Sequence, residues 1–439
     1  MTLFERVKMT QNRCMAIRQV SNSRDLKSWH HSCIVSQQEK QPTQLESSFM
    51  LTDHHINVIK STIPLLESAG PALTAHFYKR LFQHNPELQN IFNMTNQRNG
   101  RQGVALFEAV AAYAKNIENL AALTGAVERI AQKHTSFNVQ PEHYQVVGHH
   151  LIETLRELAG DAFTAEVEES WTAAYTFLAG IFIGREGELY QERGQAEGGW
   201  IGTRDFIVSE KKEESELVTS FVLTPADGKA VLDYQPGQYI GLEVKPEAGE
   251  YQEIRQYSLS QKPNGVNYRI SVKRETQENQ DGIVSHHMHN QVKVGDSVKL
   301  YPPAGDFFYV ERQRPVTLIS GGVGVTPMQA MLQSLAGTGK TDVTYLHACN
   351  TPAQHTFAEE VAEIVAANQW QQHVWYLEGE GQHSGKMDLN AIREELALEG
   401  DFYICGPTSF MAFIVEQLDA LGVDRDRIHY EMFGPHATL

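Results

Sequence analysis

Hydrophobic residues recur every three to four positions from residue 52 to about residue 190, which is the spacing of one face of an α-helix. One such face consists of Leu106, Val110, Tyr113 and Ile117. No strand-like alternation of apolar and polar residues interrupts this region. The pattern therefore predicts an all-α domain over residues 50–190.

The pattern changes after a glycine-rich stretch at 191–202, which we interpret as a linker. Short apolar runs follow, separated by turn residues such as Pro236-Gly237 and Gly295-Asp296. Short strands at this spacing predict a small antiparallel β-barrel over residues 203–311. The expected strands are 205–208, 217–223, 238–244, 267–272 and 297–301.

Strand and helix patterns alternate over residues 312–439. Buried strands are expected at 316–320, 343–347 and 401–405, and helices at 327–335, 357–367 and 410–421. Repeated βα units indicate an open parallel sheet. The predicted fold class is therefore multidomain: an all-α domain, an antiparallel β-barrel and an α/β nucleotide-binding domain.

Residues 1–49 differ from the rest of the chain. They are polar, they have no periodic apolar face, and they carry seven Lys and Arg residues against four acids. No apolar core of a secretory signal is present. Met50 stands directly before a helix start, so we expect a disordered leader or an over-called translation start, with a regulatory arm as the alternative.

Charge and cysteine content restrict the partners and the compartment. The net charge of −17 argues against a protein whose main task is to bind nucleic acid or an anionic membrane. No apolar run approaches the roughly 20 residues that a membrane span needs. Four cysteines in 439 residues cannot form a disulfide framework, and this usage is typical of a reducing cytoplasm.

A glycine-rich turn lies between a predicted strand and a predicted helix of the α/β region. Glycines there let a diphosphate approach the backbone, and the helix start supplies free N–H groups. A second turn follows another strand, and both turns are expected at the carboxyl edge of the sheet, where ligands bind. The alternatives are a plain tight turn and a small buried cysteine. The candidate residues are Gly322, Val323, Gly324, Val325, Thr326 and Pro327, with Cys405, Gly406 and Pro407.

The barrel region contains a second group of candidates. Arg255 could clamp a diphosphate, and aromatic rings could stack on a flavin. A turn at Gly282 is expected to open a short helix that contains Ser285. The alternatives are a surface cation for Arg255 and core packing for the tyrosines. The remaining candidates are Tyr239, Gln256, Tyr257 and Ser258.

These motifs, in this order, resemble the ferredoxin-reductase-like family of flavin and nicotinamide reductases. The resemblance implies that residues 255–258 and the Gly282–Ser285 turn hold FAD. It implies that the glycine-rich turn and residues 405–407 hold NADH or NADPH. The C-terminal segment 431–435 matches the part of the family that faces the flavin, which implicates Phe433, Gly434 and Pro435.

His134 continues the apolar helix face of Leu123, Val127 and Ile130, so its imidazole is expected to point into the interior of the helical domain. A haem could sit there, although a histidine on an apolar face can also be an ordinary core residue. No CxxCH motif occurs, so any haem would be held without thioether bonds, as haem b.

The helical region and the reductase motifs together resemble the flavohaemoglobin family over residues 50–439. The resemblance implies that His134 is the proximal iron ligand and that Tyr78 is the distal tyrosine. Glu186 is also the next position on the apolar face of Trp171 and Phe182, where it is either a surface group or a buried hydrogen-bond partner. The other haem-site residues implied are Phe92 at the haem corner, Gln102 and Leu106 on the distal helix, and Tyr144 paired with Glu186 behind His134.

The implied activity is NADH-dependent nitric oxide dioxygenation, in which NO and O2 become nitrate at a haem reduced through FAD. A flavin is needed because hydride carries two electrons whereas haem iron changes by one. Tyr78, aided by Gln102, would hydrogen-bond the bound dioxygen. The alternatives are an O2 or NO carrier or sensor, and a haem and flavin reductase for peroxides or ferric chelates. We expect a monomer. The sequence leaves open whether a lipid occupies the haem pocket.

The nicotinamide cofactor is expected to be NADH rather than NADPH. Arginine or lysine near the end of the second strand usually meets the 2′-phosphate of NADPH. Residues 345–354 contain neither. His347 could add partial charge there, which would make the preference modest.

Overall fold

The computed structural model describes residues 51–92, 101–247, 249–277 and 280–434. The leader at 1–49 lies outside these ranges. The chain forms two compact units. One contains the helical residues up to Leu81, with Leu106–Ala131 and Gln140–Glu188. The other contains Phe82–Ala105, Gln132–Val139 and everything from Leu189 onwards.

The N-terminal part is helical, as predicted. Thr52 begins the first helix because its side chain accepts a hydrogen bond from the His55 amide at 3.2 Å. The last helix is 31 residues long and ends at Gln195, five residues beyond the predicted domain boundary. The helices are α3 (Asp53–Ala69), α4 (Pro71–His84), η1 (Pro86–Asn90), α6 (Arg101–Lys115), η2 (Leu120–Leu123), α7 (Thr124–Thr135), α8 (Pro141–Ala159), η3 (Gly160–Ala162) and α9 (Ala165–Gln195).

Helices α8 and α9 approach each other closely at Gly148. A Cβ atom there would lie 2.3 Å from the ring of Tyr175, so only glycine fits. The hydroxyl of Tyr175 donates to the carbonyl oxygen of Tyr144 at 2.5 Å. This contact fixes the part of α8 that carries Tyr144.

The middle of the chain is a six-stranded antiparallel sheet, which confirms the predicted class of this region. The strand order is β4-β3-β8-β1-β2-β5, and a bridge between Leu259 and Ile270 joins the two ends of the sheet. Phe206, Phe221 and Tyr268 are fully buried in its interior. The elements are β1 (Arg204–Glu213), β2 (Val218–Pro225), β3 (Tyr239–Val244), β4 (Glu253–Ser258), β5 (Tyr268–Lys273), β6 (Thr276–Gln277), β7 (Gln280–Asp281), α10 (Ile283–Asn290) and β8 (Ser297–Leu300).

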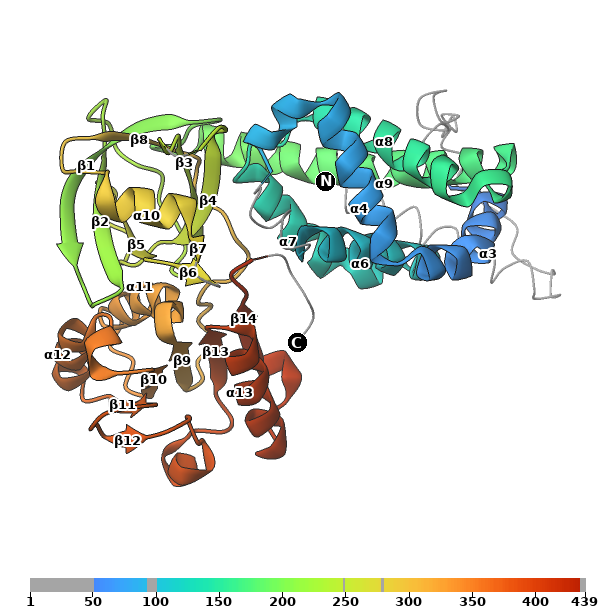
Figure 1. Ribbon diagram of the computed structural model, residues 1–439. Coiled ribbons are helices and arrows are strands. Elements are labelled where there is room, and N and C mark those ends of the chain that lie inside the picture. Colours follow the sequence, from blue (N-terminus) through green and yellow to red (C-terminus); the bar gives the residue numbers. More distant parts are fainter. Residues whose placement is uncertain (1–50, 93–100, 248, 278–279, 435–439) are drawn as a thin grey trace, which may run out of the picture. The chain divides into compact units, whose positions relative to one another are not determined.

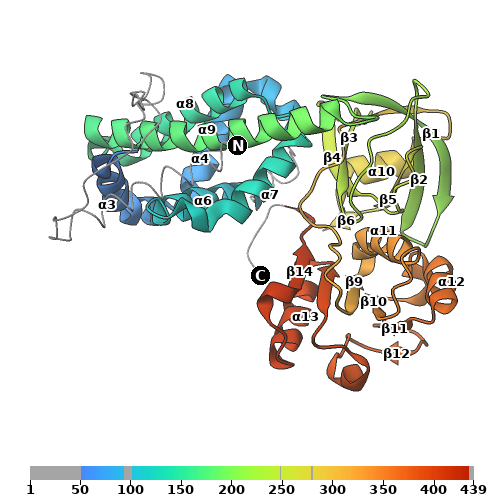
Figure 2. The same cartoon turned by 180° about the vertical axis from the view of Figure 1, so that it is seen from behind.

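The C-terminal part is a parallel sheet of six strands in the order β12-β11-β10-β9-β13-β14. Helices α11 and α12 cover one face and α13 covers the other (Figures 1 and 2). The predicted α/β class is confirmed. The strands are β9 (Val316–Gly321), β10 (Val343–Cys349), β11 (Gln371–Tyr376), β12 (His383–Ser384), β13 (Asp401–Cys405) and β14 (Ile428–Glu431), and the helices are η4 (Gly322–Gly324), α11 (Val325–Leu335), η5 (Pro352–Gln354), α12 (Ala358–Asn368), η6 (Asn390–Glu395), α13 (Thr408–Ala420) and η7 (Arg425–Arg427).

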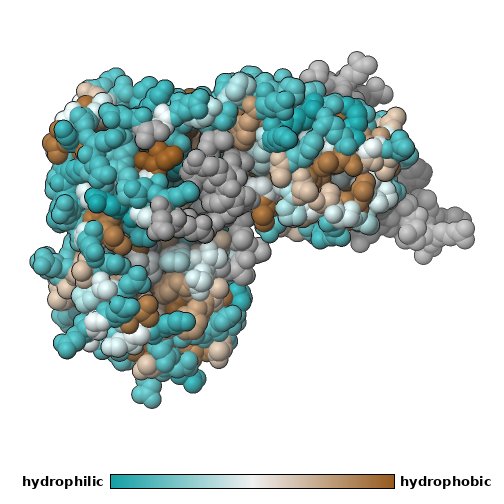
Figure 3. Space-filling model, in the orientation of Figure 1, coloured by the Kyte–Doolittle hydropathy of each residue, from teal (hydrophilic) through white to brown (hydrophobic). Residues whose placement is uncertain are grey.

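One face of the molecule shows how polar and apolar residues are distributed on its surface. The face seen in Figure 3 is largely hydrophilic, with hydrophobic residues interspersed. Among the described residues, no helix is both long enough and apolar enough to cross a bilayer.

Candidate functional site

The glycine-rich turn after β9 has room for a ligand at one position. Gly322 has a φ of +53°, and a Cβ atom there would meet no atom within 4 Å. The turn is closed by Thr326, whose hydroxyl donates to the carbonyl oxygen of Val323 at 3.0 Å. Val325 begins α11, and Pro327 lies in its first turn, where a missing N–H costs nothing. Open space over a glycine at a helix start fits a dinucleotide phosphate.

The second predicted turn lies directly beside the first. Cys405 of β13 pairs in register with Ser320 of β9, so both turns leave the same edge of the sheet. A Cβ atom on Gly324 would lie 2.2 Å from the carbonyl oxygen of Cys405. Burial raises the pKa of the Cys405 thiol well above its usual range, so the thiol is neutral. Gly406 is buried and Pro407 is exposed at the start of α13.

The residues expected to hold FAD in the antiparallel sheet line the end of β4. Arg255 donates to Glu253 Oε2 at 2.7 Å, so its guanidinium is held by a buried carboxylate. Tyr257 packs on the sheet core, and burial raises the pKa of its phenol to about 12. Ser258 is buried at the end of the strand. Its pairing partner is Tyr239 of β3.

The turn before α10 is tightly closed. Gly282 caps this helix, and the hydroxyl of Ser285 donates to the Gly282 carbonyl oxygen at 3.1 Å. The same hydroxyl accepts from the Glu275 amide at 3.2 Å. The Ser285 side chain therefore shapes the turn, and the first N–H groups of α10 have no carbonyl partner within the helix.

Two of the C-terminal candidates are described. Phe433 is 48% exposed, so part of this residue is accessible to a partner. The carbonyl oxygen of Gly434 accepts from Lys133 Nζ at 2.6 Å. Pro435 lies outside the described residues.

His134 is the last residue but one of α7, which ends at Thr135. Its carbonyl oxygen accepts from the amides of Phe137 at 3.0 Å and Val139 at 3.1 Å. Asn138, with a φ of +56°, makes this tight reversal. The imidazole therefore stands at a helix end whose backbone is well fixed, and an imidazole nitrogen is a suitable donor for haem iron.

The other residues expected around a haem lie in separate elements. Tyr78 of α4 is 8% exposed and packs edge-on against Phe77 at 5.0 Å. Phe92 packs edge-on against Phe82 at 5.5 Å. Leu106 is half-buried in α6. Gln102 lies in the first turn of α6, but its side chain is outside the described atoms.

The structure brings Tyr144 and Glu186 together. The Tyr144 hydroxyl donates to Glu186 Oε1 at 2.5 Å, and the ring of Phe182 stacks on that of Tyr144. Glu186 is only 2% exposed. Of the two interpretations of this carboxylate, the buried hydrogen-bond partner is therefore confirmed.

Comparison with known proteins matches all three parts of the chain. Family models match residues 75–182 (globin), 205–309 (oxidoreductase FAD-binding domain) and 318–416 (oxidoreductase NAD-binding domain). A flavohemoprotein of Vibrio cholerae is 67% identical over 392 residues, which is 89% of this chain and all of that protein. The chain belongs to the flavohaemoprotein family.

Two solved structures extend the likeness. The FAD- and NAD-binding part of a nitric oxide dioxygenase from Vibrio cholerae is 62% identical, with a TM-score of 0.51, over 53% of this chain and 99% of that one. A flavohemoglobin from Malassezia yamatoensis, solved with FAD and haem, is 25% identical, with a TM-score of 0.79, over 88% of this chain and all of that one. The order of domains in the flavohaemoprotein family is thus the order found here.

A pair of stacked imidazoles corrects one expectation for this member of the flavohaemoprotein family. The His347 ring is fully buried and stacks on His355 at 4.6 Å, and its Nδ1 lies 2.8 Å from Ser320 Oγ. Burial lowers the pKa of His347 well below its usual range and that of His355 to about 4. His347 is therefore neutral and cannot lend charge to a 2′-phosphate. This stack could not be predicted from the sequence, because it depends on how the loop after β10 places His355 against His347.

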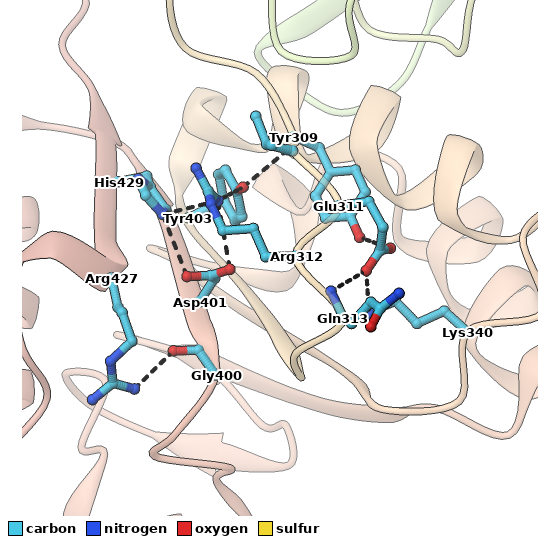
Figure 4. A network of polar contacts seen from close by, with 11 residues as sticks. Tyr309, Glu311, Arg312, Gln313, Lys340, Gly400, Asp401, Tyr403, Arg427 and His429 are labelled. Atoms are coloured by element: carbon cyan, nitrogen blue, oxygen red, sulfur yellow. Dashed lines mark hydrogen bonds and ion pairs between the residues drawn. The ribbon is translucent and has the colours of Figure 1, made fainter.

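A polar network fixes the segment that joins the FAD-binding and NAD-binding parts (Figure 4). Arg312 donates to the Tyr403 hydroxyl at 3.0 Å and lies 3.5 Å from the buried carboxylate of Asp401. The Val310 amide donates to the same hydroxyl at 3.1 Å. His429 lies 3.6 Å from Asp401, and burial together with Arg312 lowers its pKa. The joining segment is thus bound to two strands of the parallel sheet.

Proposed function

We propose that the chain is an NADH-dependent nitric oxide dioxygenase, which converts NO and O2 to nitrate. The observation that carries the proposal is the 67% identity to a flavohemoprotein over that protein's whole length, together with the joined FAD- and NAD-binding domains. A carrier or sensor has no need of a built-in reductase. When bound, haem supplies one-electron iron chemistry, FAD divides the electron pair of a hydride, and NADH supplies that hydride.

The reductase residues bind and orient the nucleotides. Gly322 leaves the backbone open to a diphosphate beside the Cys405 turn. Arg255, held by Glu253, places a cation near the end of β4, where the FAD diphosphate needs one. The turn at Gly282 offers the free N–H groups of α10 to the same diphosphate. The exposed ring of Phe433 supplies a flat surface for the flavin.

The helical residues hold the iron and its oxygen substrate. His134 supplies the proximal nitrogen. The buried Glu186 carboxylate and Tyr144 form a hydrogen-bonded pair that we assign to the proximal side, where it would orient the imidazole and make it more electron-rich. Tyr78 supplies a buried hydroxyl donor on the distal side.

The test is the consumption of NADH after NO is added to the aerated protein. Each NADH supplies two electrons and each nitrate needs one, so we expect about two nitrates per NADH. NADH consumption that does not respond to NO would contradict the dioxygenase and favour the carrier, the sensor or a reductase for other acceptors. Fast oxidation of NADH with peroxide or ferric chelates, but not with NO, would identify that last class.

A further inference from the structure

The segment that carries His134 is built into the FAD-binding part of the molecule. Residues 132–139 belong to the same compact unit as the antiparallel sheet, whereas the earlier residues of α7 belong to the helical unit. Gln256 Nε2 of β4 donates to Ser136 Oγ at 2.5 Å. A Cβ atom on Gly241 of β3 would lie 2.5 Å from the carbonyl oxygen of Ser136. The backbone after His134 therefore lies directly on the sheet.

Arg193, in the last turn of α9, joins this contact from another direction. Its guanidinium donates to the side-chain oxygens of Gln132 and Thr135, the residues on either side of the Lys133–His134 pair. Both acceptors are almost fully buried. A guanidinium has five donors in a planar fork, so one arginine can hold two acceptors in a fixed relation.

The oxygen of Gln132 has a second donor. The backbone amide of Gly305, in the loop after β8, donates to the same Oε1 at 3.1 Å. Gly305 has a φ of +114°, and its missing side chain leaves space for the ring of Tyr239. Gln132 Oε1, near the end of α7, thus accepts hydrogen bonds both from the end of α9 and from the loop after β8. That loop lies against Tyr239, one of the candidate flavin-site residues.

We propose that Arg193 is a positioning residue that, through Gln132 and Thr135, fixes the His134 segment on the FAD-binding sheet and so sets the rate at which electrons pass from flavin to haem. The inference rests on the proposed function, since it needs both groups to be bound. Electron transfer slows as the distance between donor and acceptor grows, so an error in the placement of this segment would lower its rate. Holding this segment at two buried side chains restricts such errors.

The experiment compares four variants of the full-length holoprotein. Arg193→Gln removes the charge and the fork, and Arg193→Lys keeps the charge without the fork. Thr135→Val removes one acceptor at nearly constant shape, which keeps the test valid should Arg193→Gln fold poorly. Arg156→Gln is the matched control, because that arginine pairs only with the carboxylates of Glu153 and Glu168 on α8 and α9 among the contacts described.

Two measurements are made on each variant. Hydrogen–deuterium exchange reports the opening of residues 132–139. Stopped-flow spectroscopy follows flavin bleaching by NADH and the later reduction of the haem Soret band separately. For Arg193→Gln we expect exchange in 132–139 to rise about tenfold and haem reduction to slow about tenfold, with flavin bleaching unchanged. Thr135→Val should shift both in the same direction, Arg193→Lys should restore part of the loss, and Arg156→Gln should match the wild type.

Unchanged haem reduction in both Arg193→Gln and Thr135→Val would overturn the proposal. Faster exchange throughout the FAD-binding sheet, with slower flavin bleaching, would also overturn it, since Arg193 would then support the fold in general. Failure of the proposed function gives a different result. The wild-type protein would then lack haem or flavin absorbance, or would fail to consume NADH on addition of NO despite normal haem reduction.

Discussion

The roles of the Tyr78 hydroxyl and the Tyr78 ring can be tested separately. The ring packs on Phe77 inside the helical part, so Tyr78→Phe keeps the packing and removes only the donor. A hydrogen bond to a partly charged acceptor contributes roughly 1.5–3 kcal/mol, which is about tenfold or more in a rate. We therefore expect O2 release from the ferrous protein to speed up by about tenfold, as measured by stopped flow.

The rate of flavin reduction by NADH serves as the internal control for Tyr78→Phe and should not change. An O2 release rate equal to that of the wild type would show that Tyr78 does not hold the ligand. Gln102, on the first turn of α6, would then be the residue to test.

The stacked histidines predict an acid-sensitive NAD-binding domain. The folded state keeps His355 neutral with a pKa of about 4, whereas the unfolded chain takes up a proton near pH 6.5. The contribution to stability is therefore complete above about pH 6.5 and is lost as the pH falls towards 4. For His355 alone this loss is about 2 kcal/mol at pH 5.

Urea unfolding of the NAD-binding domain, followed between pH 7 and 5, measures this loss. His355→Gln should flatten the dependence on pH, and the exposed His54→Gln should leave it intact. An equal slope in wild type and His355→Gln would contradict the assignment.

Single residues differed in how well the sequence revealed them. Glu186 could be predicted, because it continues an apolar helix face on which a carboxylate stands out. Arg193 and Gln132 could not, because they lie 61 residues apart and nothing in their spacing indicates a contact. Polar contacts between distant segments follow from tertiary packing, which periodicity does not encode.

Among the elements, the turn between β9 and α11 lies very close to the end of β13. Gly324→Ala would place a Cβ atom 2.2 Å from the Cys405 carbonyl oxygen, so backbone must move. Overpacking of this kind costs about 1–3 kcal/mol. We expect lower stability of the NAD-binding domain and a KM for NADH raised about tenfold, in steady-state reduction of a dye.

Gly337→Ala is the control for the same domain, since its Cβ atom would meet only one atom, at 3.9 Å, and the residue is exposed. A KM for NADH that is unchanged in Gly324→Ala would contradict the placement of the cofactor at this turn.

The end of β10 predicts which nicotinamide cofactor is used. No arginine or lysine occurs in residues 345–354, and His347 is buried and neutral. A 2′-phosphate would meet no cation from this segment, and a charge-assisted hydrogen bond contributes roughly 1.5–3 kcal/mol. We expect kcat/KM for NADH to exceed that for NADPH by at least about tenfold. Equal values would mean that a cation from another segment reaches the phosphate.

The central strands of the parallel sheet were predictable, whereas β11 and the edge strand β14 were not. Strands β9 and β13 are apolar or fully buried along their length, which gives a clear signal. Strand β11 begins with two glutamines and contains His373, and β14 is four residues long with polar residues at its second and last positions. Strands at or next to the edge of a sheet need less apolar surface, so their pattern is weaker.

For the whole chain we predict one haem b and one FAD per molecule. The purified protein should show a Soret band and flavin absorbance, and acid acetone should extract the haem, since no CxxCH motif occurs. His134→Ala should lose haem but keep FAD and NADH-dependent dye reduction, because the two sheets have their own cores. A haem-replete His134→Ala protein would exclude this histidine as the ligand.

The order of domains follows from the change in hydrophobic period along the chain, from helical to short alternating runs and then to βα units. The assignment of residues 132–139 to the unit of the FAD-binding sheet could not be predicted, since residues 132–135 continue the helical pattern of α7. The boundary between the compact units lies within α7. Hydrophobic periodicity predicts the helix, but it does not predict to which unit each part of the helix belongs.

The glycine-rich stretch after α9 packs closely against the end of that helix and against the FAD-binding part. A Cβ atom on Gly199 would lie 1.8 Å from the carbonyl oxygen of Arg193, Gly198 abuts the backbone of Val231, and the indole of Trp200 donates to the Leu300 carbonyl oxygen at 3.1 Å. One residue added within this stretch would therefore displace backbone that is packed against the end of α9 and the FAD-binding part, so we expect such an insertion to lower the stability of that part.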